Sequence, residues 1–459
     1  MCTDTRAIAA GNAFVALSGE RFDGHDHVAA AIERGASMLI VSRTVSAPAR
    51  VSVIQVDDTT RALGDLARAH RRRWSARASG ASNVVIAITG SAGKTTTRRA
   101  IASLLTELGA RVHATTGNLN NAIGIPMVLF GLTDAHDTAV IEVGTSSPGE
   151  IAYGASITAP DVAVLTMVAA AHSEGLGSIA DIAREKGALF EALDPSGIAI
   201  ANGDDAFAVA QLVRSRAGRW IRYGTHEGAD VRVLGRASRG LGGSRIELSL
   251  HGTARRGSSE LPSAPASLEV ETPLLGAAGT YATAAAVATA SALHPNGLSS
   301  RAVTAAFATL SEAETGRLAP RTLEDGTIVL DDSYNANRVS MIAGIETAAE
   351  LAAQLGRRLV LVLGEMRELG PLSAEEHDLV GQAAARAKPA LLIAVTGDAS
   401  RIQRVAKAAG IDTRFVSDAE AAAALLRESL RPGDVVLVKA SRSIGLDRVA
   451  RALVSGDVR

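Results

Sequence analysis

The sequence is poor in cysteine and in aromatic residues. It has one cysteine, Cys2, and only 3% of its 459 residues are aromatic. A single cysteine excludes an internal disulfide framework and is typical of proteins in a reducing compartment. With so few aromatic rings, the core must be built from aliphatic side chains, and alanine is abundant throughout the chain.

The chain also lacks an excess of either charge, with 47 basic and 48 acidic residues and a net charge of −1. A balanced charge argues against a nucleic-acid-binding surface or a polybasic membrane surface, so we expect no nucleic-acid partner. No apolar run is long enough to cross a membrane, and the N-terminus does not read as a signal peptide. We therefore expect no membrane insertion and a cytoplasmic location.

A glycine-rich turn, ITGSAGKTTTR, occupies residues 88–98. It follows the apolar run Val84–Ile88 and precedes apolar residues at helical spacing from Ile101 to Leu108, which predicts a strand, a turn and a helix. Backbone N–H groups of such a turn, together with the helix N-terminus, bind phosphate. We therefore predict a nucleotide-binding loop made by Gly90, Ser91, Gly93, Lys94, Thr95 and Thr96. The alternative is an ordinary β–α turn with a solvated lysine.

Apolar strands alternate with helical segments along the whole chain, which predicts an α/β fold. At this length we expect about three domains, and we place them at residues 1–80, 81–296 and 297–459. In the first, the basic run His70–Arg73 is predicted to be a solvated helix end. In the second, the Gly-, Ser- and Arg-rich segment 235–262 is predicted to be a polar hairpin insertion without chemistry.

Several polar residues follow predicted strands, at the sheet edge where α/β folds bind ligands. Glu142 ends one strand, and a carboxylate beside a phosphate loop is a natural Mg²⁺ ligand, although such a residue is often only solvated. His172 follows the next strand; a lone loop histidine is more often structural than a ligand, but its place beside Glu142 favours a ligand. In the third domain, Asp331–Asn337 ends a strand, although Asp and Asn also make turns. Arg317 lies upstream, and an arginine arriving from another domain can stabilise phosphoryl transfer.

Lys186 lies on the apolar face of a predicted helix. Ser178 can cap this helix, whose apolar stripe includes Ile179, Ile182 and Leu189. A buried ammonium is costly and its pKa falls, and the neutral amine can accept CO₂ to form a carbamate. The alternative is a lysine at the edge of the stripe with its ammonium in water. The helix pattern alone leaves both open.

These motifs, in this order, resemble those of the Mur ligases, most closely the MurF type. The matching stretches include TDTRAIAAGNAFVALSGERFDGHDHV, ITGSAGKTTT, TTGNLNNAIGIP, AHSEGLGSIADIAREKGALF, LDDSYNAN and VKASRSIGLDRV. The resemblance implies a UDP-sugar-binding N-terminal domain, a central P-loop ATPase domain and a Rossmann-like C-terminal domain. It also implies an ATP-dependent amide ligase that joins D-alanyl-D-alanine to UDP-N-acetylmuramoyl-tripeptide through an acyl phosphate, in peptidoglycan precursor synthesis.

The resemblance further implies roles for individual residues. Catalysis is implied for Lys94, Glu142, His172, Lys186 and Arg317. Metal binding is implied for Thr95, Glu142, His172 and Lys186 as its carbamate. The C-terminal domain is implied to add Arg317, Asp332 and Tyr334 to the ATP site. Substrate binding is assigned to Thr5, Arg6, Asn118, Asn120, Asn121, Asn335 and Asn337. The implied cofactors are ATP, Mg²⁺ and a carbamylated lysine, and the implied partners are a UDP-activated muramoyl peptide and an amino-acid or dipeptide amine. We expect a monomer.

The chain departs from the family pattern near the adenine. Ala278, Gly279 and Ala282 stand where the family has polar side chains, so we expect weaker ATP binding and a relaxed choice between ATP and GTP. Such departures also suit a paralogue that ligates another carboxylate and amine, or a weakened homologue that acts as a binding module. A simple P-loop kinase would leave the first and third domains unexplained.

Overall fold

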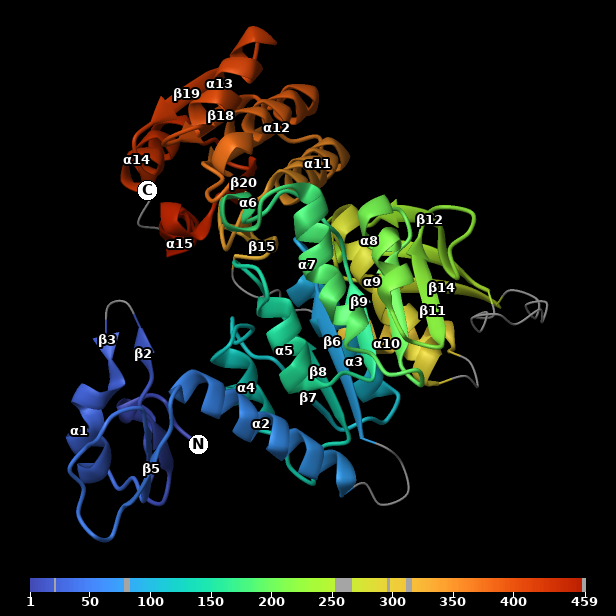
Figure 1. Ribbon diagram of the computed structural model, residues 1–459. Coiled ribbons are helices and arrows are strands. Elements are labelled where there is room, and N and C mark those ends of the chain that lie inside the picture. The colour runs from blue at the N-terminus through green and yellow to red at the C-terminus, as the bar shows by residue number, and fades with distance from the viewer. Residues whose placement is uncertain (20–21, 78–82, 252–265, 295–297, 311–315, 456–459) are drawn as a thin grey trace.

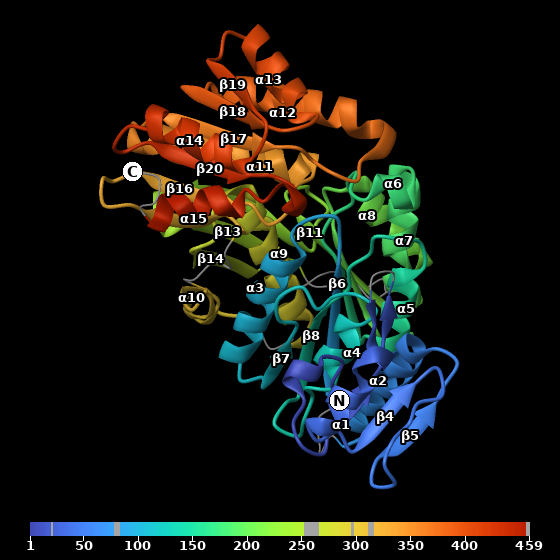
Figure 2. The same ribbon diagram turned by 90° about the vertical axis from the view of Figure 1, so that its left-hand side faces the viewer.

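The computed structural model describes residues 1–19, 22–77, 83–251, 266–294, 298–310 and 316–455. Their strands form an N-terminal, a central and a C-terminal sheet, besides a short hairpin. Figures 1 and 2 both place the C-terminal sheet above the central one and the N-terminal sheet below it. The predicted mixed α/β architecture is confirmed. The predicted domain boundaries, near residues 80 and 296, lie outside the described residues and stay predictions.

The N-terminal sheet is small and parallel, in the order β1-β4-β5, and its core contains Phe14, Val28 and Leu39. Its strands are β1 (Ala13–Val15), β4 (Met38–Val41) and β5 (Ser52–Gln55), beside a hairpin of β2 (Ser18–Gly19) and β3 (Phe22–Asp23). Its helices are the 3₁₀ turns η1 (Thr5–Ala7) and η2 (Gly24–His27), and α1 (Val28–Glu33). The long helix α2 (Thr59–Ala76) then runs to the central sheet (Figure 1).

The predicted solvated helix end at His70–Arg73 is wrong for one of its arginines. Arg71 is buried, and its guanidinium donates to the carbonyls of Thr158 (2.9 Å) and Ala159 (2.6 Å) and pairs with Asp161 (3.2 Å). These carbonyls end helix α5 (Glu150–Thr158), where a cation is favoured. Arg71 therefore fixes α2 to the central domain, while Arg72 and Arg73 are exposed.

The central sheet has nine strands in the order β14-β13-β12-β11-β10-β9-β6-β8-β7. From β7 to β12 they are parallel, and β12, β13 and β14 are antiparallel. Their bounds are β6 (Val84–Thr89), β7 (Val112–Ala114), β8 (Thr138–Glu142), β9 (Val162–Leu165), β10 (Ile198–Asn202), β11 (Arg219–Gly224), β12 (Val231–Ser238), β13 (Ser244–Leu250) and β14 (Ala266–Thr272).

Alternate residues of these strands pack against helices on opposite faces of the sheet, because successive side chains of a strand point to opposite sides. Ile86 and Ile88 join a core with α3 (Lys94–Glu107), α9 (Gly276–Leu293) and α10 (Ser300–Ala308). Val85 and Ala87 join a second core with α2, α5, α4 (Gly124–Leu129), α7 (Ile179–Glu191) and α8 (Ala206–Gln211). The short elements α6 (Ser173–Leu176), η3 (Leu212–Arg214) and η4 (Gly240–Gly242) complete this domain.

The predicted hairpin at 235–262 is present as far as the structure describes it, but it is not a separate insertion. β12 and β13 pair as the antiparallel continuation of the central sheet, and Ile246 and Leu248 are completely buried against α9 and α10. One face of the hairpin is therefore core. Residues 252–262 of the predicted segment lie outside the described residues.

The C-terminal sheet has the order β15-β16-β20-β17-β18-β19, parallel except for the edge strand β15. Its strands are β15 (Ala319–Thr322), β16 (Ile328–Asp332), β17 (Leu359–Gly364), β18 (Leu391–Val395), β19 (Thr413–Val416) and β20 (Val435–Lys439). One face is covered by α11 (Arg338–Leu355), α12 (Ser373–Ala387) and α13 (Ala399–Ala408), and the other by α14 (Ala419–Ser429) and α15 (Asp447–Ser455). The turns η5 (Gly370–Leu372) and η6 (Arg442–Ile444) join them.

Polar contacts dock the C-terminal domain on the central domain, beside apolar packing that includes Leu275. Arg236 of β12 makes a bidentate pair with Glu350 of α11, at 2.9 and 2.7 Å. The backbone N–H of Glu174 donates to the Glu368 carbonyl at 3.2 Å. Among the described residues no helix combines the length and apolarity that crossing a membrane requires.

Candidate active site

The phosphate loop has the backbone that its sequence predicts. Gly90 has a φ of 151°, and a Cβ atom there would stand 1.9 Å from the hydroxyl of Thr166. Gly93 is in the left-handed region, with a φ of 83°, and caps α3 at its N-terminus. Both positions favour glycine because L side chains rarely adopt these conformations. The strand–turn–helix prediction is confirmed: β6 ends at Thr89 and α3 starts at Lys94.

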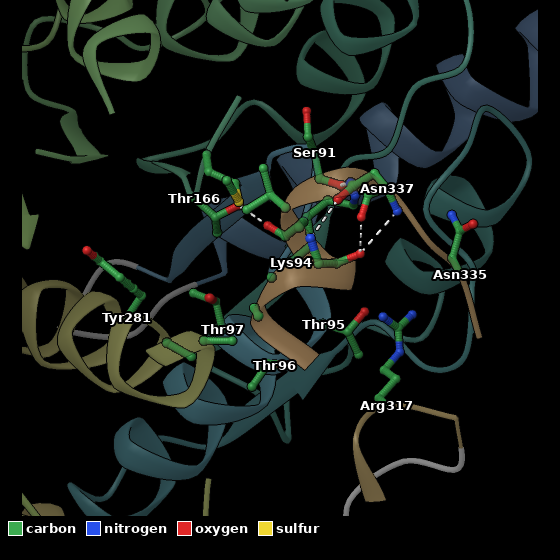
Figure 3. A pocket seen from close by; sticks show the side chains of 18 of the residues that line it. Ser91, Lys94, Thr95, Thr96, Thr97, Thr166, Tyr281, Arg317, Asn335 and Asn337 are labelled. Carbon is green, nitrogen blue, oxygen red and sulfur yellow. Dashed lines mark hydrogen bonds between the residues drawn. The ribbon is translucent and has the colours of Figure 1, made fainter. Parts of the chain in front are cut away.

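The segment after β9 holds the loop in place (Figure 3). Ser91 donates its backbone N–H to the Met167 carbonyl (2.8 Å) and its hydroxyl to the Ala169 carbonyl (2.9 Å). Thr166 donates its hydroxyl to the Ala92 carbonyl at 2.6 Å. Only the backbone carbonyl of Ala92 takes part in this contact.

The Lys94 ammonium turns back onto the loop and donates to the Gly90 carbonyl at 2.8 Å. Burial lowers the pKa of Lys94, and the neighbouring charge of Arg317 lowers it further, while Glu142 opposes both. An anion placed here would offset the desolvation of the ammonium. The loop lysine is therefore not simply solvated, as the ordinary-turn alternative requires.

Glu142, at the end of β8, is 1% exposed and faces the start of α3. It accepts a hydrogen bond from the Thr95 hydroxyl at 3.1 Å and pairs with the Arg98 guanidinium at 2.8 Å. Arg98 also donates to the carbonyl of Thr115. Sequence reasoning missed Arg98, which reads as one more basic residue on a helix. The pair places a hydroxyl and a carboxylate oxygen together beside the phosphate loop.

A cavity of about 1060 Å³ lies between the central and C-terminal domains. It brings together most of the predicted site residues, namely Ser91, Gly93, Lys94, Thr95, Thr96, Asn118, Asn120, Asn121, Glu142, His172, Arg317, Asp332, Tyr334, Asn335 and Asn337. Gly90, although it belongs to the loop, is not among the lining residues. Thr5, Arg6 and Lys186 do not line the cavity either.

The C-terminal wall of the cavity is built around a buried lysine that sequence reasoning missed. Lys439, the last residue of β20, pairs with Asp332 at 2.6 Å and donates to the Asn335 carbonyl at 3.0 Å. Burial raises the pKa of Asp332, and the Lys439 charge opposes this rise. The guanidinium of Arg317 lies over the ring of Tyr334, 4.0 Å from its centre. The only feature of the sequence that points to Lys439 is its place at the end of a predicted buried strand.

Asn337 links the two domains at the phosphate loop itself. Its side-chain amide donates to the Ser91 carbonyl at 3.0 Å, and its oxygen caps α11 by accepting from the Ser340 N–H at 2.9 Å. Arg317, by contrast, approaches Lys94 from another side of the loop (Figure 3). The contact of Asn337 is with protein, so its predicted role in substrate binding stays a prediction.

His172 lines the same cavity but is paired across the domain interface. Its Nδ1 contacts the carboxylate of Glu368, a residue that no sequence motif named above distinguishes. Burial lowers the pKa of His172, and the carboxylate acts against that shift. Its backbone φ is 57°, in the left-handed region. Within the described ranges no cluster of three His, Cys, Asp or Glu side chains could hold a metal; Mg²⁺ at a phosphate needs fewer protein ligands than that.

Lys186 is buried, which rules out the solvated edge position considered above. It is 3% exposed on α7, whose N-terminus has the predicted Ser178 cap, completed as a capping box by Asp181. Desolvation, and then the charge of Lys94, lower the pKa of Lys186 to about 7. In the described part of the chain no hydrogen bond or ion pair reaches its ammonium.

The predicted substrate residues fall in three places, one of which is the C-terminal wall of the cavity with Asn335 and Asn337. Asn118, Asn120 and Asn121 form a polar loop before α4 at the cavity wall, where the Asn121 side chain also accepts the Gly124 N–H at 2.8 Å. Thr5 and Arg6 lie in η1 of the N-terminal domain, where Arg6 pairs with Asp4 at 2.6 Å. The exposed η1 turn is therefore separate from the interdomain cavity.

Three domain families match the chain: "Mur ligase family, catalytic domain" over residues 1–71, "Mur ligase middle domain" over 88–290, and "Mur ligase, glutamate ligase domain" over 316–442. The UDP-N-acetylmuramoyl-tripeptide--D-alanyl-D-alanine ligase of Escherichia coli K12 is 38% identical over 98% of this chain and 92% of that protein.

Solved structures agree with this match. MurF from Acinetobacter baumannii superimposes with a TM-score of 0.83 at 29% identity, covering 99% of this chain and 93% of that one. The MurF ligase of Thermotoga maritima in complex with ADP gives a TM-score of 0.81 at 26% identity, covering 99% and 96%. Together with the phosphate loop and the interdomain cavity, these matches show that the chain belongs to the Mur ligase family.

Proposed function

We propose that this protein is an ATP-dependent ligase that joins D-alanyl-D-alanine to UDP-N-acetylmuramoyl-tripeptide in peptidoglycan precursor synthesis. The observation that carries the proposal is the single cavity in which the phosphate loop faces Arg317 and Asp332 from the C-terminal domain and the asparagine loop before α4. A kinase of one P-loop domain needs no such second wall. The named Escherichia coli relative, matched over nearly the full chain, supports the substrate assignment.

In the proposed reaction, a carboxylate oxygen of the tripeptide attacks the γ-phosphorus of ATP, and the bond to the β-phosphate oxygen breaks, giving ADP and an acyl phosphate. The amine of D-alanyl-D-alanine then attacks the acyl carbon. The C–O bond breaks, phosphate leaves, and the nitrogen loses a proton. Both steps spread negative charge over phosphate oxygens, which preorganised cations stabilise. Lys94 and Arg317 are two of the cations that line the cavity.

The residues beside the loop fit a Mg²⁺ ion. The Thr95 hydroxyl and the Glu142 carboxylate are 3.1 Å apart, and hard oxygen ligands of this kind suit Mg²⁺ bound together with phosphate. When bound, the ion would neutralise phosphate charge. Arg98 orients Glu142 by pairing with its other oxygen. We propose that His172, held through Nδ1 by Glu368, offers its remaining ring nitrogen to a second metal position.

We further propose that Lys186 is carbamylated. A buried lysine with a pKa of about 7 is partly neutral at physiological pH, and a neutral amine can react with CO₂. The carbamate carries a negative charge, so the repulsion between Lys186 and Lys94 would become an attraction. This change would support the charge of Lys94 from behind the cavity lining.

We propose a division of roles among the three domains, with boundaries near residues 80 and 296. Thr5 and Arg6 would hold the uridine diphosphate on the exposed η1 turn, with Asp4 orienting the Arg6 guanidinium in the free protein. Asn118 and Asn120 would contact the peptide end of the same substrate at the cavity wall. Tyr334 would position Arg317 by stacking, and Asp332 would be fixed by Lys439.

Incubation with UDP-N-acetylmuramoyl-tripeptide, ATP, Mg²⁺ and D-alanyl-D-alanine tests the proposal. We expect a product with the mass of the UDP-pentapeptide, and phosphate release that requires both the UDP-substrate and the amine. L-Alanyl-L-alanine is a matched acceptor control. Phosphate transfer that ignores the amine would identify a kinase, and binding without turnover would identify a binding module; either result contradicts the proposal.

A further inference from the structure

The cavity differs in character on the two sides of the phosphate loop. On the side of Arg317 it carries that guanidinium and the asparagines before α4, together with apolar C-terminal residues such as Leu318 and Ile342. Toward α9 it is lined by the apolar side chains of Pro273, Leu274, Leu275 and Ala277 and by the three small residues Ala278, Gly279 and Ala282. A flat base is less polar than phosphate and fits the second side, whereas an anionic peptide substrate fits the first.

The second side contains an aromatic ring that the sequence analysis did not consider. Tyr281 lies on α9 between Gly279 and Ala282 and lines the cavity. In Figure 3 it lies across the phosphate loop from Arg317. The other two tyrosines of the lining are otherwise engaged. Tyr223 is buried in the core, and the ring of Tyr334 is contacted by the guanidiniums of Arg317 and Arg442, at 4.0 and 4.8 Å.

The Tyr281 ring is fixed by its hydroxyl, which donates to the Asp204 carboxylate at 2.8 Å. Asp204 is itself held by the backbone N–H groups of Thr225 (2.6 Å) and His226 (2.9 Å). Its oxygens are therefore committed to the protein rather than to a base edge. Burial and the hydrogen bond to Asp204 raise the pKa of Tyr281 to about 12, so the phenol stays protonated and keeps its anchor.

We propose that Tyr281 is a stacking platform for the nucleotide base, which replaces recognition of the base edge by hydrogen bonds. The inference rests on the proposed function, because it assumes that the phosphate loop holds a nucleoside triphosphate. Stacking accepts any base, because every base has a π face. Ala278 and Gly279 offer no side-chain hydrogen bonds to a base. Stacking on Tyr281 would restore affinity for the nucleotide without selecting among bases. Non-hydrolysable ATP and GTP analogues are expected to bind within about tenfold of each other.

Calorimetric titration with these two analogues, and separately with inorganic tripolyphosphate, all with Mg²⁺, tests the inference. Tyr281→Ala should weaken both analogues by a similar factor of about 5 to 150, the range for losing one base stack. Tripolyphosphate has no base, so its affinity should not change. Tyr281→Trp keeps a ring and should bind both analogues at least as well as Tyr281→Phe, which loses only the anchor to Asp204.

Tyr153→Phe is the matched control, because the Tyr153 hydroxyl contacts the Thr60 carbonyl away from the cavity. It should leave all three affinities unchanged. Normal analogue binding by a folded Tyr281→Ala protein would overturn the inference, as would a loss confined to the adenine analogue, which would indicate reading of the base edge. If the unmodified protein bound neither analogue nor tripolyphosphate, the proposed function itself would fall, and the inference with it.

Discussion

Replacement of Lys186 by methionine should make the protein more stable and inactive. Methionine has a similar length and no charge, so it can occupy the buried site on α7 without the cost of desolvating an ammonium. Lys186 is 3% exposed, and burial lowers its pKa from 10.5 to about 7. We therefore expect Lys186 to be kept for its chemistry at the expense of stability, as at other strained functional sites.

The size and pH dependence of the effect follow from the two pKa values. Below pH 7 the lysine is charged in both the folded and the unfolded chain, and the folded state carries the full cost, ~5 kcal/mol for a shift of this size. Above pH 7 the folded lysine is neutral while the unfolded one still binds a proton. Stability of the unmodified protein then rises with pH by ~1.4 kcal/mol per unit until both forms are neutral.

Urea unfolding of both proteins between pH 6 and 9, in CO₂-free buffer, measures this difference. The advantage of Lys186→Met should be largest at pH 6 and should fall steadily above pH 7. Lys407→Met is the matched control, because Lys407 is exposed on α13 and its loss should give a small, pH-independent change. Added bicarbonate should stabilise only the unmodified protein, because CO₂ can bind only where Lys186 is present. Parallel pH profiles for the two proteins would refute a buried, partly neutral lysine.

Other expected outcomes concern the loop, the buried pairs and the domain arrangement. Lys94→Ala should abolish product formation in the ligation assay with an unchanged circular dichroism spectrum; near-normal turnover would refute the loop assignment. Arg98→Met should destabilise the protein by about 3–5 kcal/mol in urea unfolding because it leaves Glu142 buried and unpaired, and a change below about 1 kcal/mol would contradict this. Small-angle scattering should show a more open molecule without ligands than with an ATP analogue plus UDP-substrate; identical profiles would indicate a permanently closed enzyme.

The sequence could predict whatever depends on local pattern. The phosphate loop is a strand, a turn and a helix that are contiguous in the chain, so the places of Gly90, Lys94 and Thr95 in that unit were identifiable. The α7 cap at Ser178 and the strand ending at Glu142 follow from the same short-range rules. The family resemblance then ordered these local features into domains, and the matches to family and structure confirm that fold.

Buried charged residues could not be predicted in the same way, because their partners are distant in the chain. Arg98 reads as a helix-surface residue, yet it pairs with Glu142 on another strand. Arg71 reads as part of a basic run, yet its partners are carbonyls at the end of α5. The short strand β15 is hard to predict for another reason: an antiparallel edge strand of four residues carries too little pattern to identify.

The two buried lysines, Lys186 and Lys439, are almost equally buried but differ in their partners. Lys439 is 2% exposed and Lys186 is 3% exposed, so both ammonium groups have left water to a similar degree. Lys439 is compensated by Asp332 at 2.6 Å and by the Asn335 carbonyl, an arrangement that retains the charge. Lys186 instead lies near the positive charge of Lys94. Among the residues the structure describes, no acidic side chain bonds to its ammonium. A lysine in that position is relieved by losing its proton or by reversing its charge, and addition of CO₂ achieves the second. The contrast with Lys439 therefore favours the carbamate over an ordinary structural lysine.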